Sequence, residues 1–458
     1  MKPLLVLDVV GLTPSLLPHA PRISAIAKDG FSTPLTPAIP AVTCTAQSSM
    51  LTGLAPSGHG IVANGWYDRE RAEVAFWKQS NRLVQGEKVW DALRARDPAA
   101  TTAVLFWWFN MYGSAEVSVT PRPAYPADGR KLPDCYSHPG DLRDALQAEL
   151  GTFPLFRFWG PGASIESTRW IAEASKSVLR RHRPALHLVY LPHLDYPLQK
   201  VGPGDPSIPA EVAAVDALAG EVADAHRAQG YGVVVLSEYG ITSVTDASFP
   251  NRVLRDAGLL AFRDDATGEL LDHGASRAFA VPDHQVAHVY ARSPRDAAAA
   301  REALTSAAGV DAVLEGADRA AIGLDHPRSG ELVLLSARGR WFAHDWWTDP
   351  ARAPDYQRTV DIHRKPGYDP RELFLDPSKP LVKARLVAKV LARKLGFRNL
   401  LDVIPLDTSL VRGSHGLAPP SPEAGPLLVS DDPRVPFDGP DQRAVKDFLL
   451  RRLGDSPR

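Results

Sequence analysis

The sequence predicts an α/β protein with a doubly wound, mixed but mostly parallel sheet, flanked by helices and carrying a smaller inserted α+β lobe. Short, unbroken apolar runs are typical of strands that are buried on both faces. Helical segments separate these runs, and this alternation favours a parallel sheet. Acidic residues follow several runs, at the strand ends where open α/β sheets place ligands. The expected strands are residues 4–8, 101–107, 186–191 and 232–236, and the expected helices are 87–97, 166–181 and 210–229.

The domain organisation follows from length and composition. At 458 residues the chain could hold two or three average domains, or one large α/β domain with insertions. We divide it into a core domain, an inserted α+β lobe and a return to the core, at residues 1–275, 276–345 and 346–458. Within the core, residues 108–162 are rich in Pro, Gly, Asp and Tyr, and we interpret them as an excursion that could wall a substrate pocket.

The composition gives little support to a large charged partner. The 52 basic and 53 acidic residues leave a net charge of −1, so no bulk electrostatic argument for nucleic-acid or membrane binding follows. Two cysteines, Cys44 and Cys135, are too few for a disulfide framework. Asp8 interrupts the N-terminal apolar run too early for a signal peptide, and no apolar run approaches the ~20 residues of a membrane span. We expect a cytoplasmic protein that acts on a small molecule and binds neither nucleic acid nor membrane; its oligomeric state stays open.

Thr43 lies in the most informative stretch of the chain. Pro40 ends an extended approach, and residues 46–51 are predicted to be helical. A hydroxyl group at a loop-to-helix junction lies where free N–H groups and the helix dipole favour negative charge. That position suits a nucleophile that attacks a phosphoryl or sulfuryl group. The alternative is that Thr43 only caps the helix.

The same stretch resembles the nucleophile segment of the alkaline phosphatase superfamily, closest to its type I phosphodiesterase/nucleotide pyrophosphatase and phosphonoacetate hydrolase branches. Those branches carry a Thr, a Thr-Gly, a Pro, a His-Gly-Ile and an Asn in this order. The chain has them at Thr43, Thr52-Gly53, Pro56, His59-Gly60-Ile61 and Asn64. The resemblance implies an alkaline phosphatase-like fold, Thr43 as the nucleophile and Asn64 as a ligand of a phosphate oxygen, with the backbone at residue 44.

The resemblance also implies two divalent metal ions, which can offset phosphoryl charge and activate a nucleophile. Partial matches to the family's metal-binding segments lie at Asp8, Pro192–Pro203, Ser237–Ile241 and Gly413–Gly416. One metal would take Asp8, Thr43 and Glu238, with Tyr239 as a further candidate. The other would take Asp195 and His415, with Gln199 as a further candidate.

Three of these positions depart from the family pattern. The usual set has three His, whereas this chain has Gln199 and Tyr239 at two of those places and Glu238 in the place of an Asp. Tyr239 could bind as phenolate or donate a hydrogen bond instead, and His193 could compensate for Gln199. Oxygen-rich ligands favour Mn²⁺, Mg²⁺, Ca²⁺ or iron over Zn²⁺, which is not excluded.

Other candidate groups have no role in the family pattern. His363 and Lys365 lie in a segment dense in functional groups, and we consider both as possible substrate or extra ligands. His284 and His288 are four apart and would share a strand face, where a structural role competes with metal binding. The basic helix at residues 381–395 is interpreted as a solvated face.

The sequence therefore predicts a metal-dependent hydrolase of phosphate esters. Phosphodiester or pyrophosphate bonds are the expected substrates, cleaved through a phosphothreonine-type intermediate on Thr43. Phosphomonoester hydrolysis, phosphonate hydrolysis and phosphoryl transfer are alternatives within the superfamily. A non-catalytic member with an altered metal site is the alternative from a different class.

Overall fold

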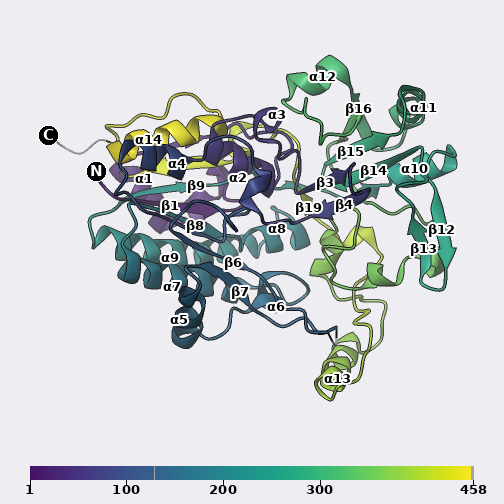
Figure 1. Cartoon of the computed structure of the whole chain (residues 1–458), viewed down its shortest axis with the longest axis horizontal. Helices are drawn as coiled ribbons and strands as arrows, with labels where there is room; N and C mark the ends of the chain where they lie inside the picture. Colours follow the sequence, from purple (N-terminus) through teal and green to yellow (C-terminus); the bar gives the residue numbers. More distant parts are fainter. Residues whose placement is uncertain (128, 455–458) are drawn as a thin grey trace.

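An eight-stranded sheet forms the centre of the computed structural model, which describes residues 1–127 and 129–454 (Figure 1). The strand order is β2-β20-β9-β1-β8-β5-β6-β7. Neighbours from β9 to β6 pair in parallel, whereas β20 and β7 pair antiparallel with the strands beside them. The strands are β1 (Leu4–Val9), β2 (Phe31–Pro34), β5 (Thr102–Leu105), β6 (Val117–Pro121), β7 (Cys135–His138), β8 (Leu186–Leu191), β9 (Gly232–Leu236) and β20 (Leu427–Ser430).

The three central strands have the apolar runs that the sequence analysis used. Every residue of β8, β1 and β9 is buried, as expected for strands covered on both faces. The register places Asp8 opposite Tyr190 on one side and Leu236 on the other. Because parallel strands end at the same edge, Asp8 and the residues that follow β8 and β9 meet there.

Helices cover both faces of the sheet, so the doubly wound mixed sheet predicted from the sequence is confirmed. The helices α1, α7 and α9 pack together on one side, and α2, α4 and α14 pack together on the other. In α9 the buried residues recur every three or four positions, which is the pattern of an amphipathic helix facing a core. The bounds are α1 Pro21–Asp29, α2 Thr43–Thr52, α4 Val89–Arg96, α7 Ile165–His182, α9 Ile208–Arg227 and α14 Val445–Gly454.

A second, antiparallel sheet lies in the inserted part of the chain, with order β14-β15-β17-β16. Its own hydrophobic cluster includes Leu254, Phe279 and Trp346. The strands are β14 (Ala278–Asp283), β15 (Val286–Ala291), β16 (Val310–Leu314) and β17 (Leu332–Ser336), packed with α10 (Pro250–Asp256) and α11 (Pro294–Thr305). The exact domain boundaries stay a prediction.

The remaining elements are short or peripheral. The helices are α3 Pro56–His59, α5 Asp141–Leu150, α6 Leu155–Phe158, α8 Asp195–Val201, α12 Gly316–Ala321 and α13 Val382–Lys394. The strands are β3 Gly65–Asp68, β4 Glu73–Phe76, β10 Thr242–Ser243, β11 Asp246–Ser248, β12 Phe262–Asp265, β13 Gly268–Leu271, β18 Arg340–Phe342 and β19 Gly413–Ser414.

Two segments contribute more to the core than their composition suggested. The excursion at residues 108–162 supplies β6 and β7 at one edge of the main sheet, together with α5. Ser118 and Thr120 are buried in β6, so this strand lacks an apolar run in the sequence. The Pro-rich tail after Leu417 supplies β20, which inserts between β2 and β9.

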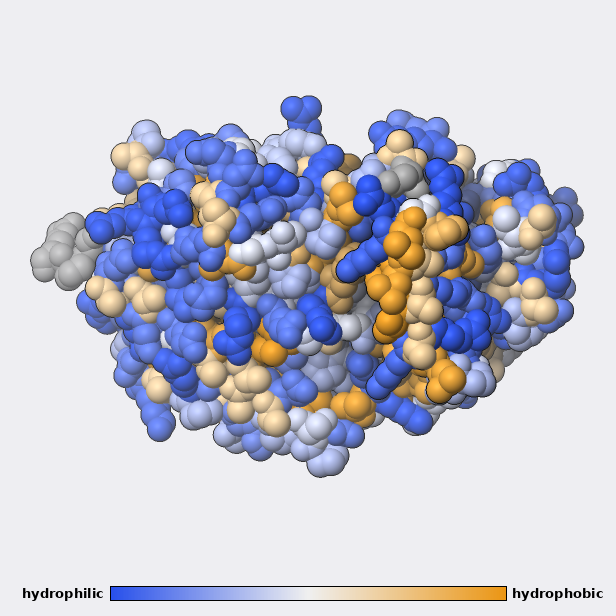
Figure 2. Space-filling model, turned by 90° about the horizontal axis from the view of Figure 1, so that it is seen from below, coloured by the Kyte–Doolittle hydropathy of each residue, from blue (hydrophilic) through white to orange (hydrophobic). Residues whose placement is uncertain are grey.

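The helix α13 projects from the body of the molecule at the lower edge of Figure 1. Figure 2 views the molecule from that side and shows hydrophobic and hydrophilic side chains next to each other on this surface. Within the described residues, no helix combines the length and the apolar character needed to cross a membrane.

Candidate active site

Thr43 is the first residue of α2, directly after the extended residue Val42. It is therefore a helical residue, and Val42 takes the cap position. All ten residues of α2 are buried, so the helix start faces the interior. The Cys44 N–H at this helix start donates to Oδ1 of Asn64 at 3.0 Å. The Thr43 hydroxyl group therefore lies in a buried environment at the N-terminal, positive end of the α2 helix dipole.

Gln47 lies one turn after Thr43 and joins two carboxylates. Its Nε2 donates to Oδ2 of Asp8 at 3.3 Å and to Oε1 of Glu238 at 2.6 Å. Its own Oε1 accepts from the Trp108 N–H at 2.7 Å, which fixes the orientation of the amide. The other carboxylate oxygens, Oδ1 of Asp8 and Oε2 of Glu238, are buried without a hydrogen-bond partner among the described residues.

Burial dominates the electrostatics of this carboxylate pair. It raises the pKa of Asp8 to about 7. It also raises the pKa of Glu238 well above its ordinary value, and the charge of Asp8 adds to that shift. Two carboxylates in one dry site cannot both stay ionised without a cation or a shared proton.

Tyr239 connects Thr43 to Asp195. Its hydroxyl oxygen lies 3.0 Å from Oγ1 of Thr43, and its O–H donates to Oδ1 of Asp195 at 3.1 Å. Burial and the charge of Asp195 raise the pKa of Tyr239 well above its ordinary value. Of the two roles left open by the sequence, this arrangement has Tyr239 as a neutral hydrogen-bond donor.

Gln199 extends the chain of contacts beyond Asp195. Its Nε2 donates to Oδ2 of Asp195 at 2.7 Å, and its Oε1 accepts from the Tyr368 hydroxyl at 3.0 Å. Both oxygens of Asp195 therefore accept hydrogen bonds, from Tyr239 and Gln199. Burial raises the pKa of Asp195 to about 7.

His415 completes the site with an unpartnered nitrogen. Its Nδ1–H donates to the Ala41 carbonyl at 2.7 Å, whereas its Nε2 is buried without a hydrogen-bond partner among the described residues, 3.7 Å from Oδ1 of Asp195. Burial lowers the pKa of His415 to about 3, so the ring is neutral and Nε2 carries a lone pair. The ring stacks on Tyr239, with centroids 3.7 Å apart and planes at 8°, and its centroid lies 3.6 Å from that of His284.

Asn64 is held by Asp283, a residue of β14. The Asn64 backbone N–H donates to Oδ2 of Asp283 at 2.7 Å, and its Nδ2 donates to Oδ1 at 3.1 Å. Burial raises the pKa of Asp283 to about 7. The donors expected to hold a phosphate oxygen, Asn64 Nδ2 and Cys44 N–H, are therefore paired within the protein in this structure.

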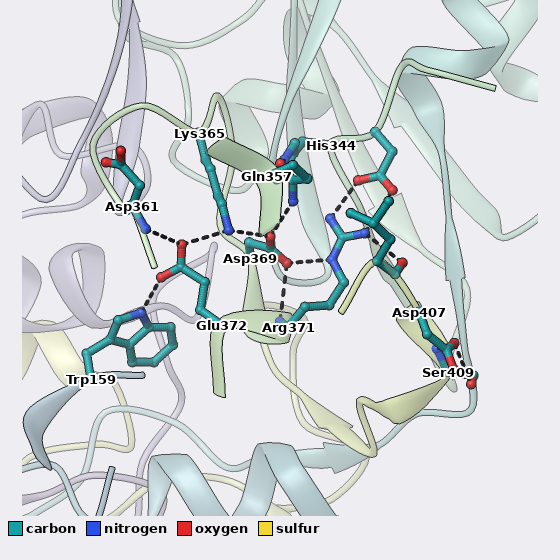
Figure 3. A network of polar contacts seen from close by, with 12 residues as sticks. Trp159, His344, Gln357, Asp361, Lys365, Asp369, Arg371, Glu372, Asp407 and Ser409 are labelled. Atoms are coloured by element: carbon teal, nitrogen blue, oxygen red, sulfur yellow. Dashed lines mark hydrogen bonds and ion pairs between the residues drawn. The ribbon is translucent and has the colours of Figure 1, made fainter. Parts of the chain in front are cut away.

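Lys365 belongs to a buried network of charged groups beside the site (Figure 3). Its Nζ lies 2.9 Å from Oδ2 of Asp369 and 2.8 Å from Oε1 of Glu372. Arg371 pairs with Asp369 and with Asp345. The network contacts the site through Tyr368, the residue before Asp369. The Tyr368 hydroxyl donates a hydrogen bond to Oε1 of Gln199.

His363 lies apart from these groups. It is exposed, and its Nδ1–H donates to the Phe76 carbonyl at 3.3 Å. His284 and His288 do not share the strand face expected from the sequence, because His284 lies in the turn between β14 and β15 whereas His288 is in β15. His288 Nε2–H donates to the Val62 carbonyl at 3.1 Å. His193 bonds Glu211 at 2.6 Å and does not compensate for Gln199.

The structure thus brings together eight of the ten predicted residues through direct contacts or shared partners. They are Asp8, Thr43, Asn64, Asp195, Gln199, Glu238, Tyr239 and His415. Sequence reasoning missed Gln47, Asp283 and Tyr368. Gln47 had a usable signal, because it lies at i+4 from Thr43 and so on the same helix face. Asp283 and Tyr368 come from distant segments, and no local pattern in the sequence linked them to the site.

Known protein families and structures show which proteins this chain is similar to. The family model described as type I phosphodiesterase / nucleotide pyrophosphatase matches residues 4–369, which is more than half of the chain. The chain belongs to this family. It lies in the alkaline phosphatase superfamily, as the motif around Thr43 indicated, and its family is one of phosphoester hydrolases.

The family relatives are distant. An uncharacterised pyrophosphatase/phosphodiesterase from Schizosaccharomyces pombe is 24% identical over 247 residues, which cover 52% of this chain and 42% of the relative. The chain thus matches less than half the length of that curated relative.

Solved structures share the fold at low identity. Phosphonoacetate hydrolase from Sinorhizobium meliloti 1021, in complex with phosphonoacetate, gives a TM-score of 0.63 at 17% identity, covering 99% of this chain and 95% of that one. Murine ectonucleotide pyrophosphatase / phosphodiesterase 5 in complex with AMP gives 0.58 at 14% identity, covering 100% and 96%. At these identities the likeness extends to the fold alone.

The family's metal dependence raises the question whether these side chains fit a cation. In the described part of the chain, no group of three or more His, Cys, Asp or Glu is arranged as a metal site. Nor does any described Lys or Arg pair with Asp8, Asp195 or Glu238. Buried carboxylates without a counter-charge are costly, and three unpartnered acceptor atoms point into the site: Asp8 Oδ1, Glu238 Oε2 and His415 Nε2. The donor set therefore fits a hard cation with mostly oxygen ligands, completed by hydroxyl or amide oxygens.

Proposed function

We propose that this family member hydrolyses phosphodiester or pyrophosphate bonds with Thr43 as the nucleophile and with the help of divalent cations. One observation carries the proposal: the Thr43 hydroxyl lies at a buried helix start, within 3.0 Å of Tyr239 and beside carboxylates to which no described Lys or Arg supplies a counter-charge. That environment favours a bound phosphoryl group only when cations offset the carboxylates. The structures with the same fold include complexes with phosphonoacetate and with AMP, which supports a small phosphorylated molecule as the substrate.

The proposed first step is an in-line displacement at phosphorus. A bond forms between Oγ1 of Thr43 and phosphorus while the bond to the departing ester oxygen breaks. The Thr43 proton moves to the Tyr239 hydroxyl oxygen as the Tyr239 proton moves to Oδ1 of Asp195, along the 3.0 Å and 3.1 Å contacts. The departing ester oxygen leaves as an anion and takes a proton from solvent. In the second step a water oxygen bonds to phosphorus while the bond between phosphorus and Oγ1 of Thr43 breaks. The proton on Asp195 returns through Tyr239 to Oγ1 of Thr43, and the proton lost by the attacking water goes to solvent.

We propose two sets of ligand residues in this site, each of which would hold one cation. Asp8, Glu238 and Thr43 would hold one, and their two free carboxylate oxygens support it most strongly. Asp195 and His415, with the Gln199 amide, would hold a second, weaker one, because both oxygens of Asp195 already accept hydrogen bonds. A bound divalent cation would offset negative charge on the phosphoryl oxygens. The oxygen donors favour Mn²⁺, Mg²⁺, Ca²⁺ or Fe²⁺ over Zn²⁺.

A specific observation supports a second candidate, a non-catalytic binding protein with the same fold. The Gln47 amide donates to both Asp8 and Glu238, and Tyr239 and Gln199 stand where the family pattern has His. Such a site could bind a phosphorylated ligand through fewer or no cations.

The test combines metal analysis of the purified protein with turnover of an aryl phosphodiester and an aryl phosphomonoester, with Mn²⁺, Mg²⁺, Ca²⁺ or Zn²⁺ added in turn. We expect metal-dependent diester cleavage that falls at least about 10³-fold in Thr43→Ala. Thr45→Ala is the matched control, because Thr45 faces the Ile61 carbonyl at 3.1 Å instead of the site. Turnover that survives in Thr43→Ala would reject the nucleophile, and absence of both metal and turnover would favour the binding protein.

A further inference from the structure

The segment at residues 377–401 has the strongest excess of basic over acidic residues in the chain. It contains seven basic residues and no acidic one, in a protein whose net charge is −1. The basic residues are Lys379, Lys383, Arg385, Lys389, Arg393, Lys394 and Arg398. α13 occupies most of this segment and has no buried residue.

The outward face of α13 is apolar. Val387, Leu391 and Leu395 recur at every fourth position, so they form one stripe along the helix. Their exposed fractions are 58%, 54% and 77%, and the flanking Leu381 and Phe397 reach 80% and 67%. An ordinary surface helix buries such a stripe and exposes its polar face. Here the stripe is exposed, and Figure 2 shows hydrophobic side chains gathered on the face of the molecule from which α13 projects.

The inward face of α13 is fastened to the chain that returns from it. Lys389 Nζ donates to the Leu400 carbonyl at 2.6 Å and pairs with Asp402. Arg393 donates to the Asn399 carbonyl at 2.6 Å, and Asn399 Nδ2 donates to the Lys389 carbonyl at 3.0 Å. These bonds fix the rotation of the helix and hold its apolar stripe outward.

Free positive charges border the stripe. By helical phase Lys383 and Lys394 lie on one side of it and Arg385 on the other. These three and Arg398 form no ion pair within the described residues. Long basic side chains beside an apolar stripe can extend their charged ends to lipid headgroups while the stripe enters the acyl boundary.

We propose that α13 binds the surface of membranes that contain anionic phospholipids, lying in the plane of the interface. Its 13 residues give a helix of roughly 20 Å, suited to lying in that plane. A nucleic acid would use the basic groups but leave the aliphatic stripe in water. A second copy of the chain would cover the stripe but bring like charges together. An anionic lipid surface complements both the charge and the apolar face.

The inference is independent of the proposed hydrolysis, because no α13 residue contacts the Thr43 site. The loop that carries α13 is closed at its base by the Asp376 N–H, which donates to the Val403 carbonyl at 2.8 Å. Upstream of this base, the same segment supplies Tyr368 to the site. Binding would therefore give the site a defined orientation to the bilayer.

The test is co-sedimentation of the full chain with phosphatidylcholine vesicles, with or without phosphatidylserine. We expect binding to the phosphatidylserine vesicles that weakens as salt is raised. Leu395→Glu should reduce this binding at least about tenfold, and Lys383→Glu with Lys394→Glu should do the same. Phe156→Glu is the matched control, since Phe156 is an exposed apolar residue of α6 at 56% and should leave binding unchanged.

Other outcomes would overturn the proposal. These are the absence of binding to phosphatidylserine vesicles, or equal binding by the wild type and Leu395→Glu. If the protein forms a dimer that Leu395→Glu dissociates, and if it does not bind vesicles, then a second copy of the chain covers the apolar stripe. Binding of polyuridylate RNA without vesicle binding would make nucleic acid the partner. Unchanged circular dichroism and unchanged turnover of a soluble aryl phosphodiester would show that the variants are folded.

Discussion

The hydroxyl oxygen of Tyr239 lies 3.0 Å from Oγ1 of Thr43. This contact puts a neutral phenol where the family pattern has a metal-binding His. The same hydroxyl donates to Asp195, so it can pass the Thr43 proton onward without becoming phenolate.

Tyr239→Phe should therefore lower kcat by about 10²-fold or more with little change in KM, because proton transfer is lost while the ring remains. Steady-state kinetics on an aryl phosphodiester measure both constants. Tyr196→Phe is a suitable control, since Tyr196 is also buried but lies outside this relay. Wild-type kcat in Tyr239→Phe would mean that Thr43 loses its proton by another route.

Gln47→Ala should make the folded state more dependent on metal. The substitution removes both hydrogen bonds to the buried carboxylates Asp8 and Glu238, at a cost of roughly 1–3 kcal/mol. Thermal unfolding in a chelator and with added Mn²⁺ should show a lower Tm without metal and a larger metal-induced increase than in the wild type. Gln79→Ala, which removes bonds to Thr120 and Pro121, should show no larger metal effect. An equal metal-induced increase in both variants would argue against a cation between Asp8 and Glu238.

Acid should destabilise the protein through a buried histidine pair outside the site. His226 Nδ1–H donates to the Val222 carbonyl at 2.7 Å, so its Nε2 accepts from His187 Nδ1–H at 2.9 Å. Burial lowers the pKa of His226 to about 4, below the ~6.5 of an unfolded histidine. The unfolded state therefore binds the extra proton as pH falls from about 6.5 to about 4, and stability decreases across that window.

The expected loss is about 2 kcal/mol at pH 5 from His226 alone. Urea unfolding at a series of pH values measures it. In His226→Gln the pH dependence should flatten, even though total stability falls, whereas His19→Gln at an exposed position should leave the slope unchanged. A slope in His226→Gln equal to that of the wild type would assign the acid sensitivity to other groups.

Lys365→Met should unfold more easily, since it leaves Asp369 and Glu372 without one of their buried partners (Figure 3). Burial alone would raise the pKa of Asp369, but Arg371 and Lys365 hold it well below its usual range. Breaking such a buried pair costs about 3–5 kcal/mol. Arg443→Met, which breaks an exposed pair with Asp441, should cost less than about 1 kcal/mol by urea unfolding. An unchanged stability with a raised KM would instead support Lys365 as a substrate ligand.

Several features were predictable because their signals are local. The strands β1, β8 and β9 are apolar apart from Asp8 and His187, and the Thr43 segment is contiguous and dense in recognisable residues. Strand β6 was not predictable in this way, because its buried Ser118 and Thr120 interrupt any apolar pattern. Strand β20 sits in a Pro-rich tail and is held by pairing with strands far away in the chain.

The sequence by itself determined the α/β class, the family and eight of the polar residues that meet at the carboxyl edge of the sheet. Strand burial, helix starts and motif spacing are properties of short stretches, so they can be read without the fold. Only the tertiary structure decided how those polar groups pair. Gln47 bridges Asp8 and Glu238, and Asp283 holds Asn64, although these residues come from distant segments. A hydrogen bond depends on where two side chains end in space, and no local pattern specifies that position.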